Sequence, residues 1–218
     1  MVDWEERAAR AQERYEDGET RLPEDPDERQ RQLTRMGNAA WACGLSFLML
    51  GRREEGNDWL VRAAETYRSS WPAAPPGSWG RPIGAMKSRL IAGDLEGARI
   101  DARWALDAGA AASESPIGRY AATLADLVLG DDKAASALAA TLRGIDAIPA
   151  AVIDSLEALT AGDASAYDAA IRALIADFEA RREFLEDAPV ADTVLALQAL
   201  ADRHGLRVAC TSALLPVE

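Results

Sequence analysis

One short pattern recurs four times in this chain and constrains its fold more than any other feature. An apolar run ends in a glycine, a short polar turn follows, and an alanine-rich stretch begins. The four corners are at Gly51, at Gly93 with Asp94, at Gly130 with Asp131, and at Gly162 with Asp163. Glycine adopts the left-handed conformation that ends many helices, and an aspartate after it can cap the next helix. Each corner therefore predicts that one helix ends and another begins there.

The hydrophobic spacing on both sides of the corners predicts four antiparallel helical hairpins over residues 27–184. Their first helices are expected at about residues 27–50, 81–92, 115–129 and 149–161. Their second helices are expected at about residues 53–70, 94–109, 131–143 and 163–184. Successive corner glycines are 42, 37 and 32 residues apart, so the unit length drifts.

Further helices are expected at both ends of the hairpin array. An acidic helix from about residue 3 to residue 16, within the segment 1–22, carries one narrow apolar stripe and should end before Gly18. A closing helix at about residues 189–204 and an extended tail complete the segment 189–218. The chain is thus expected to form one all-α domain, residues 1–218, of about 9–10 stacked helices.

The composition agrees with this fold and excludes several classes of partner. Of 218 residues 46 are alanine, which loses no side-chain entropy in a helix. The net charge of −12, from 24 basic and 36 acidic residues, argues against non-specific binding to nucleic acid and against docking on anionic lipid. The apolar run Ala39 to Leu50 is too short to cross a membrane, and the N-terminus is charged from its third residue. We expect a cytoplasmic protein that binds neither nucleic acid nor membrane.

Few residues in the chain are suited to metal binding or catalysis. Cys43 and Cys210 lie far apart, and His204 is the one histidine, so the common zinc ligand sets cannot be assembled. No glycine-rich nucleotide loop is present. We therefore expect no metal, no cofactor and no catalytic residue. The alternative is an all-α enzyme or small-ligand-binding protein that uses paired carboxylates in a helical cleft, although no spacing selects a pair.

The linker between the first two hairpins holds the strongest candidates for partner binding. Trp71 and Trp79 flank a proline-rich stretch, and Arg81 follows directly. Tryptophan and arginine are the residue types that most often dominate the binding energy at protein interfaces. The two tryptophans also have a second interpretation, as large side chains that fill a gap in an alanine-rich core. The sequence leaves both interpretations open.

Three further arginines have a spacing suited to a concave surface. Stacked hairpins form a concave surface, which repeat proteins use for binding. If the hairpins stack here, the inner side of that surface could be lined by Arg89, Arg103 and Arg119. The candidate partner-binding residues are therefore Trp71, Trp79, Arg81, Arg89 and Arg119.

Two family resemblances accompany these residues. The LxxGDxxxA-type corners and the alanines after them, over residues 27–184, resemble tetratricopeptide-like helical repeats, although the period drifts and the prolines are irregularly placed. That resemblance implies a helical protein-binding scaffold. The segments WPAAPPGSWGRPIGAMKSRLIAGD and PVADTVLALQALADRHGLRVACTSALLP are similar to the end of an all-helical immunity-protein family of polymorphic toxin systems. This second resemblance implies a protein that sequesters a toxin.

Together these features predict a non-catalytic protein–protein interaction module. Its partner is expected to be another protein, with a cognate toxin as the most specific version. The apolar stripe of the N-terminal helix leaves two arrangements open, a monomer in which it packs on its own chain and a homodimer formed through that helix.

Overall fold

The computed structural model of the protein describes residues 2–217 and is all-helical over that range. It has ten α-helices and two short 3-10 helices, and these residues contain no β-strand. The α-helices are α1 (Trp4–Thr20), α2 (Pro26–Met49), α3 (Arg53–Ser69), α4 (Gly80–Ala92), α5 (Leu95–Asp107), α6 (Pro116–Leu129), α7 (Asp132–Ala140), α8 (Ala150–Ala161), α9 (Ala164–Glu179) and α10 (Asp192–Arg203). The all-α prediction is confirmed.

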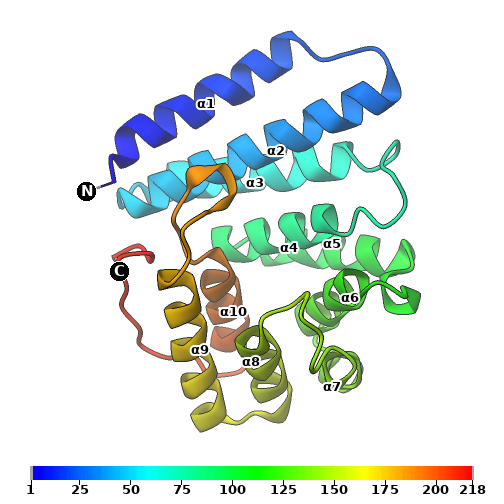
Figure 1. Ribbon diagram of the computed structural model, residues 1–218, viewed down its shortest axis with the longest axis vertical. Helices are drawn as coiled ribbons and strands as arrows, with labels where there is room; N and C mark the ends of the chain where they lie inside the picture. Colours follow the sequence, from blue (N-terminus) through cyan, green and yellow to red (C-terminus); the bar gives the residue numbers. More distant parts are fainter. Residues whose placement is uncertain (1, 218) are drawn as a thin grey trace.

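Helices that are neighbours in the sequence pack against one another from α1 to α9 (Figure 1). Three corners have the geometry that their sequence predicts. Gly93, Gly130 and Gly162 take left-handed conformations at the ends of α4, α6 and α8. The aspartate after each one accepts a hydrogen bond from a backbone N–H in the first turn of the next helix. The Gly51 corner differs, because Arg52 follows it and supplies no side-chain cap to α3.

Four predicted helix boundaries are wrong, among them the start of α10, which begins at Asp192 and not at about residue 189. α1 continues through Gly18 to Thr20, because Gly18 lies against α2 and a Cβ there would be 2.6 Å from the Met36 Cγ. α7 ends at Ala140, three residues early. α9 ends at Glu179, and the chain from residue 180 to 191 forms a loop that includes the 3-10 helix η2 (Leu185–Asp187).

The apolar stripe of α1 is buried within its own chain. Ala8, Ala11 and Tyr15 are at most 6% exposed and pack with the apolar side of α2. Trp4, the first residue of the stripe, is partly buried against the same cluster, so the stripe packs on its own chain.

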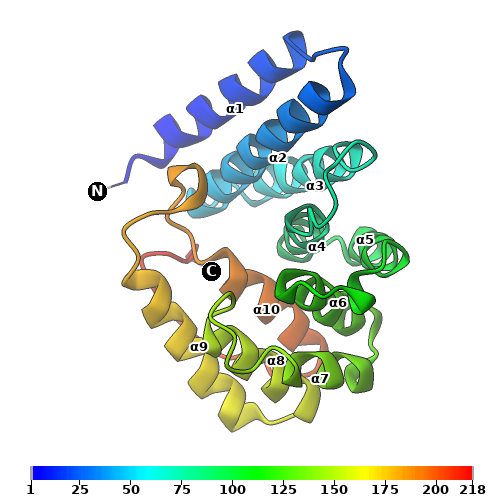
Figure 2. The same ribbon diagram turned by 45° about the vertical axis from the view of Figure 1, so that its right-hand side comes forward.

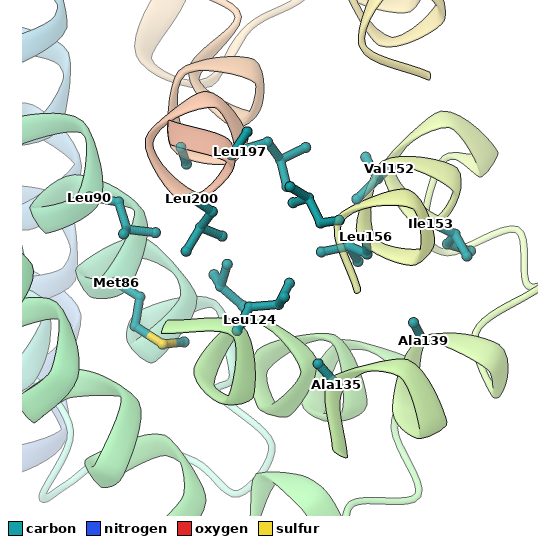
Figure 3. Packing of buried hydrophobic residues seen from close by; sticks show 14 of the residues in the cluster. Met86, Leu90, Leu124, Ala135, Ala139, Val152, Ile153, Leu156, Leu197 and Leu200 are labelled. Atoms are coloured by element: carbon teal, nitrogen blue, oxygen red, sulfur yellow. The ribbon is translucent and has the colours of Figure 1, made fainter. Parts of the chain in front are cut away.

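α10 occupies the inner side of the curved array instead of extending it. It packs against α4, α8 and α9, and Figure 2 shows it between α4 and α9. Leu197 and Leu200 of α10 point toward Met86, Leu124 and Leu156 (Figure 3), and all five belong to one buried cluster. The concave surface expected from stacked hairpins is therefore filled by the chain itself.

The tail after α10 lies extended along that helix. The backbone N–H of Ala191 donates to the Leu214 carbonyl over 2.9 Å. The Gln198 amide of α10 donates to the Val208 carbonyl and accepts from the Val208 N–H. Within residues 2–217 no helix is both long enough and apolar enough to span a lipid bilayer.

Candidate functional site

Three tryptophans, two from the linker between α3 and α4 and one from α5, form one aromatic cluster. Trp71 follows α3, Trp79 precedes α4, and Trp104 lies on α5. The ring centroids of Trp71 and Trp79 are 5.8 Å apart, and Trp71 meets Trp104 edge-on at 5.4 Å. Trp79 is only 7% exposed and belongs to the buried core, whereas Trp71 and Trp104 are half-buried. Each interpretation of the linker therefore holds for one of its two tryptophans. Trp79 fills the core, and Trp71 reaches the surface.

The exposed sides of Trp71 and Trp104 line a shallow hollow of about 460 Å³, which we call the tryptophan face. Its residues come from the end of α3, the following linker and one side of α5. They are Arg68, Trp71, Ile100, Arg103, Trp104, Asp107 and Ala108. Ile100 is 52% exposed, which is unusual for a large apolar side chain in the middle of a helix. The face thus combines apolar surface with two guanidinium groups.

A buried carboxylate holds one edge of the tryptophan face in place. Asp101 of α5 is fully buried and accepts hydrogen bonds from Arg68 of α3 and Arg89 of α4, each over 2.8 Å. The Arg68 guanidinium also lies over the Trp104 ring, 5.4 Å from its centroid. Burial raises the pKa of Asp101, and the charges of Arg89 and Arg68 oppose that shift. The ion cluster therefore ties three helices together beneath the face.

The five candidate residues do not form one surface. Arg89 is mostly buried in the ion cluster with Asp101 and Asp94, and Arg81 is buried against α2. Arg119 lies on α6 and donates to the Thr141 carbonyl at the end of α7 over 3.3 Å. The expected concave line of arginines is therefore wrong, because Arg89 and Arg119 serve separate helix contacts. Arg103, which belonged to that line, is exposed on the tryptophan face.

Several carboxylates that could have formed an acid–base pair have separate local roles. Asp163 caps α9, and Asp154 and Asp168 pair at the surface with Arg143 and Arg172. Among residues 2–217 no group of three or more histidine, cysteine or acidic side chains is arranged to hold a metal ion.

Asp126, in the last turn of α6, is the carboxylate whose surroundings most oppose its charge. Burial, together with the nearby charge of Asp131, raises the pKa of Asp126 to about 6. Helix carbonyls at a C-terminus also disfavour a negative charge. Because the folded protein then binds a proton more tightly than the unfolded chain, stability falls as the pH rises from about 4 to 6.

We expect Asp126→Asn to raise the free energy of unfolding by about 1–3 kcal/mol at pH 7.5, and by about half as much at pH 5. Denaturant unfolding at the two pH values measures this difference. Asp177→Asn is the control, because Asp177 is exposed on α9 and its replacement should change stability by less than about 0.5 kcal/mol. A less stable Asp126→Asn variant at pH 7.5 would show that the carboxylate holds a favourable contact.

Comparison of this chain with protein-family models, with curated proteins and with solved structures finds no match. The candidate site is therefore defined by the geometry of this chain alone. Sequence reasoning found Trp71 but missed Ile100, Asp101 and Trp104 as members of one site. One signal was present: Asp101 stands between Ala98 and Ala105, which share its helix face, and a charge within an apolar stripe indicates a buried polar contact.

Proposed function

We propose that this protein is a non-catalytic binding module that holds another protein at the tryptophan face. The observation that carries the proposal is the exposed Ile100 beside two half-buried tryptophans and two arginines. Exposed apolar surface with a polar rim is typical of interaction sites, and tryptophan and arginine supply most hot spots.

The face is also held in place before any partner arrives. Trp71 contacts both Trp79 and Trp104, and Arg68 is fixed by Asp101. Side chains that are already ordered lose less conformational entropy on binding, so more of the contact energy remains as affinity. The partner that fits inserts a large apolar side chain into the hollow and presents carboxylates to Arg68 and Arg103.

The more specific form of this proposal is an immunity protein that sequesters a toxin. Its support is the likeness of the linker and C-terminal segments to that family. The net charge of −12 also supports this form of the proposal, because an acidic protein associates faster with a partner that is basic overall. The first partner to test is the product of the gene adjacent to the one that encodes this chain.

We expect Ile100→Asp to weaken binding of that partner by about 30-fold, since placing a charge in the hollow removes a contact of about 2 kcal/mol. Leu185→Asp is the matched control: Leu185 is 55% exposed but lies in the 180–191 loop, outside the tryptophan face. Calorimetric titration of the purified pair measures both variants. Equal affinity of wild type and Ile100→Asp for a partner that binds would rule out this face.

A further inference from the structure

A second site lies beside Arg81, whose guanidinium is buried without enough partners. Arg81 stands in the first turn of α4 and is only 8% exposed. Its Nε donates to the Thr34 hydroxyl over 3.2 Å, and its Nη2 donates to the Gln30 side-chain carbonyl. Nη1 is shielded from water and makes no hydrogen bond within the described residues. Because a guanidinium has five N–H donors, two hydrogen bonds leave most of them unused.

The charge of Arg81 is also unbalanced. Among residues 2–217 no carboxylate lies within 4.0 Å of this guanidinium, whereas Arg89 on the same helix has both Asp94 and Asp101. Burial lowers the pKa of Arg81, but arginine stays charged at any ordinary pH. A buried cation without a counter-charge is strongly unfavourable, so such groups are normally paired.

Arg81 lies at one end of a cleft of about 420 Å³ between α2 and α4, a volume within the range of small-ligand sites. The floor of this α2–α4 cleft includes Trp41, Tyr67 and Ile83. Gly37 and Gly84 allow the Tyr67 ring to pass between the two helices, because a Cβ at either position would come within 2.9 Å of that ring. The Tyr67 hydroxyl donates to the Asn38 Oδ1 over 2.8 Å, so the floor is fixed.

The opposite end of the α2–α4 cleft is electrically balanced. Lys87 pairs with Asp192 over 2.5 Å, both side chains being 13% exposed, and Lys87 also donates to the Thr193 hydroxyl. Lys87 follows Arg81 by six residues, or about 9 Å along an α-helix. The unmatched positive charge therefore lies at the Arg81 end. There α4 begins without a side-chain cap, so its N-terminal dipole also favours an anion.

We propose that the α2–α4 cleft binds a small organic anion. Its carboxylate or phosphate group accepts hydrogen bonds from Arg81, and its apolar body lies over Tyr67 and Ile83. This site shares no residue with the tryptophan face and does not depend on the protein-binding proposal.

Four probes test the proposal and distinguish the two anion types: 3-phenylpropionate and acetate as carboxylates, phenyl phosphate and inorganic phosphate as phosphates. We expect the wild-type Tm to rise with 3-phenylpropionate or phenyl phosphate at millimolar concentration. The small anion with the same charged group, which is acetate for 3-phenylpropionate and inorganic phosphate for phenyl phosphate, should act at least 10-fold more weakly, because it lacks the apolar body. The probe that binds should also shift the NMR resonance of the Arg81 side-chain Nε–H.

Arg81→Met should abolish the response to the probe that binds while the variant remains folded. Methionine keeps the length of the side chain and removes the unpaired charge, so the Tm without ligand should stay close to that of the wild type or rise. Arg143→Met, at an exposed ion pair far along the chain, should keep the full wild-type response. An equal response of Arg81→Met, or no response of the wild type to any probe, would overturn the proposal. An Arg81→Met variant that does not fold would leave the Nε–H shift in the wild type as the deciding measurement.

Discussion

Replacement of Asp101 by alanine is expected to destabilise the protein by about 3 kcal/mol or more, which is among the largest effects of any single side chain here. Asp101 is fully buried and accepts from Arg68 and Arg89, which lie on two other helices. Removing the carboxylate leaves Arg89, which is mostly buried, with Asp94 as its remaining close partner. Breaking a buried pair from one side typically costs 3–5 kcal/mol, because a charge stays behind in a poorly solvated place.

The loss should come from the orphaned arginine and not from the ion cluster as a whole. Burying an ion pair roughly balances the cost of dehydration against the attraction between the charges. The double variant Asp101→Leu with Arg89→Met should therefore recover most of the stability that Asp101→Ala loses. Asp168→Ala, which breaks an exposed pair with Arg172, should cost less than about 1 kcal/mol.

Denaturant unfolding of the single and double variants at pH 7.5 measures these differences. If the double variant is no more stable than Asp101→Ala, the three-helix contact depends on the charges themselves. Under the proposed function, Asp101→Ala should also weaken binding of the partner at the tryptophan face, because it frees Arg68 to leave the Trp104 ring. An Asp101→Ala variant that is as stable as the wild type would contradict the structural role assigned to Asp101.

The parts of the fold that follow from local chemistry were predictable from the sequence. A glycine that ends a helix and an aspartate that caps the next act within a few residues, so the Gly93, Gly130 and Gly162 corners lie where the sequence places them. The predicted helix end at Gly18 is wrong, because this glycine serves instead for a close contact with α2. There the missing side chain allows close packing and the helix continues. Conformational preference alone cannot distinguish these two uses of glycine.

The candidate site depended on information that helical spacing does not contain. Arg68, Arg89 and Asp101 come together only because α3, α4 and α5 have particular rotations about their axes, which are set by the packing of many residues. Trp79 and Trp71 belong to one linker and have similar surroundings in sequence, yet one is buried and the other reaches the surface. α10 had a predictable helix pattern, but nothing in that pattern indicated that it would fill the inner side of the array.

Gly44→Val is expected to destabilise the protein by about 3 kcal/mol, because Gly44 of α2 lies directly against the backbone of α3. A Cβ on Gly44 would lie 2.9 Å from the Gly56 carbonyl oxygen and 3.0 Å from the Leu60 backbone nitrogen. Backbone atoms cannot rotate away as side chains do, so the two helices would have to separate. Leu45, Leu48 and their neighbours would lose contact as a result.

For a chain of this size a loss of 3 kcal/mol corresponds to a fall in Tm of about 6–12 °C. Gly80→Val is the matched control, because a Cβ at Gly80 meets no atom within 4 Å and the residue is exposed at the start of α4. It should change stability by no more than about 0.5 kcal/mol. Thermal unfolding of both variants under the same conditions compares them directly. If Gly44→Val unfolds at the same temperature as Gly80→Val, α2 and α3 cannot approach each other as closely as this contact requires.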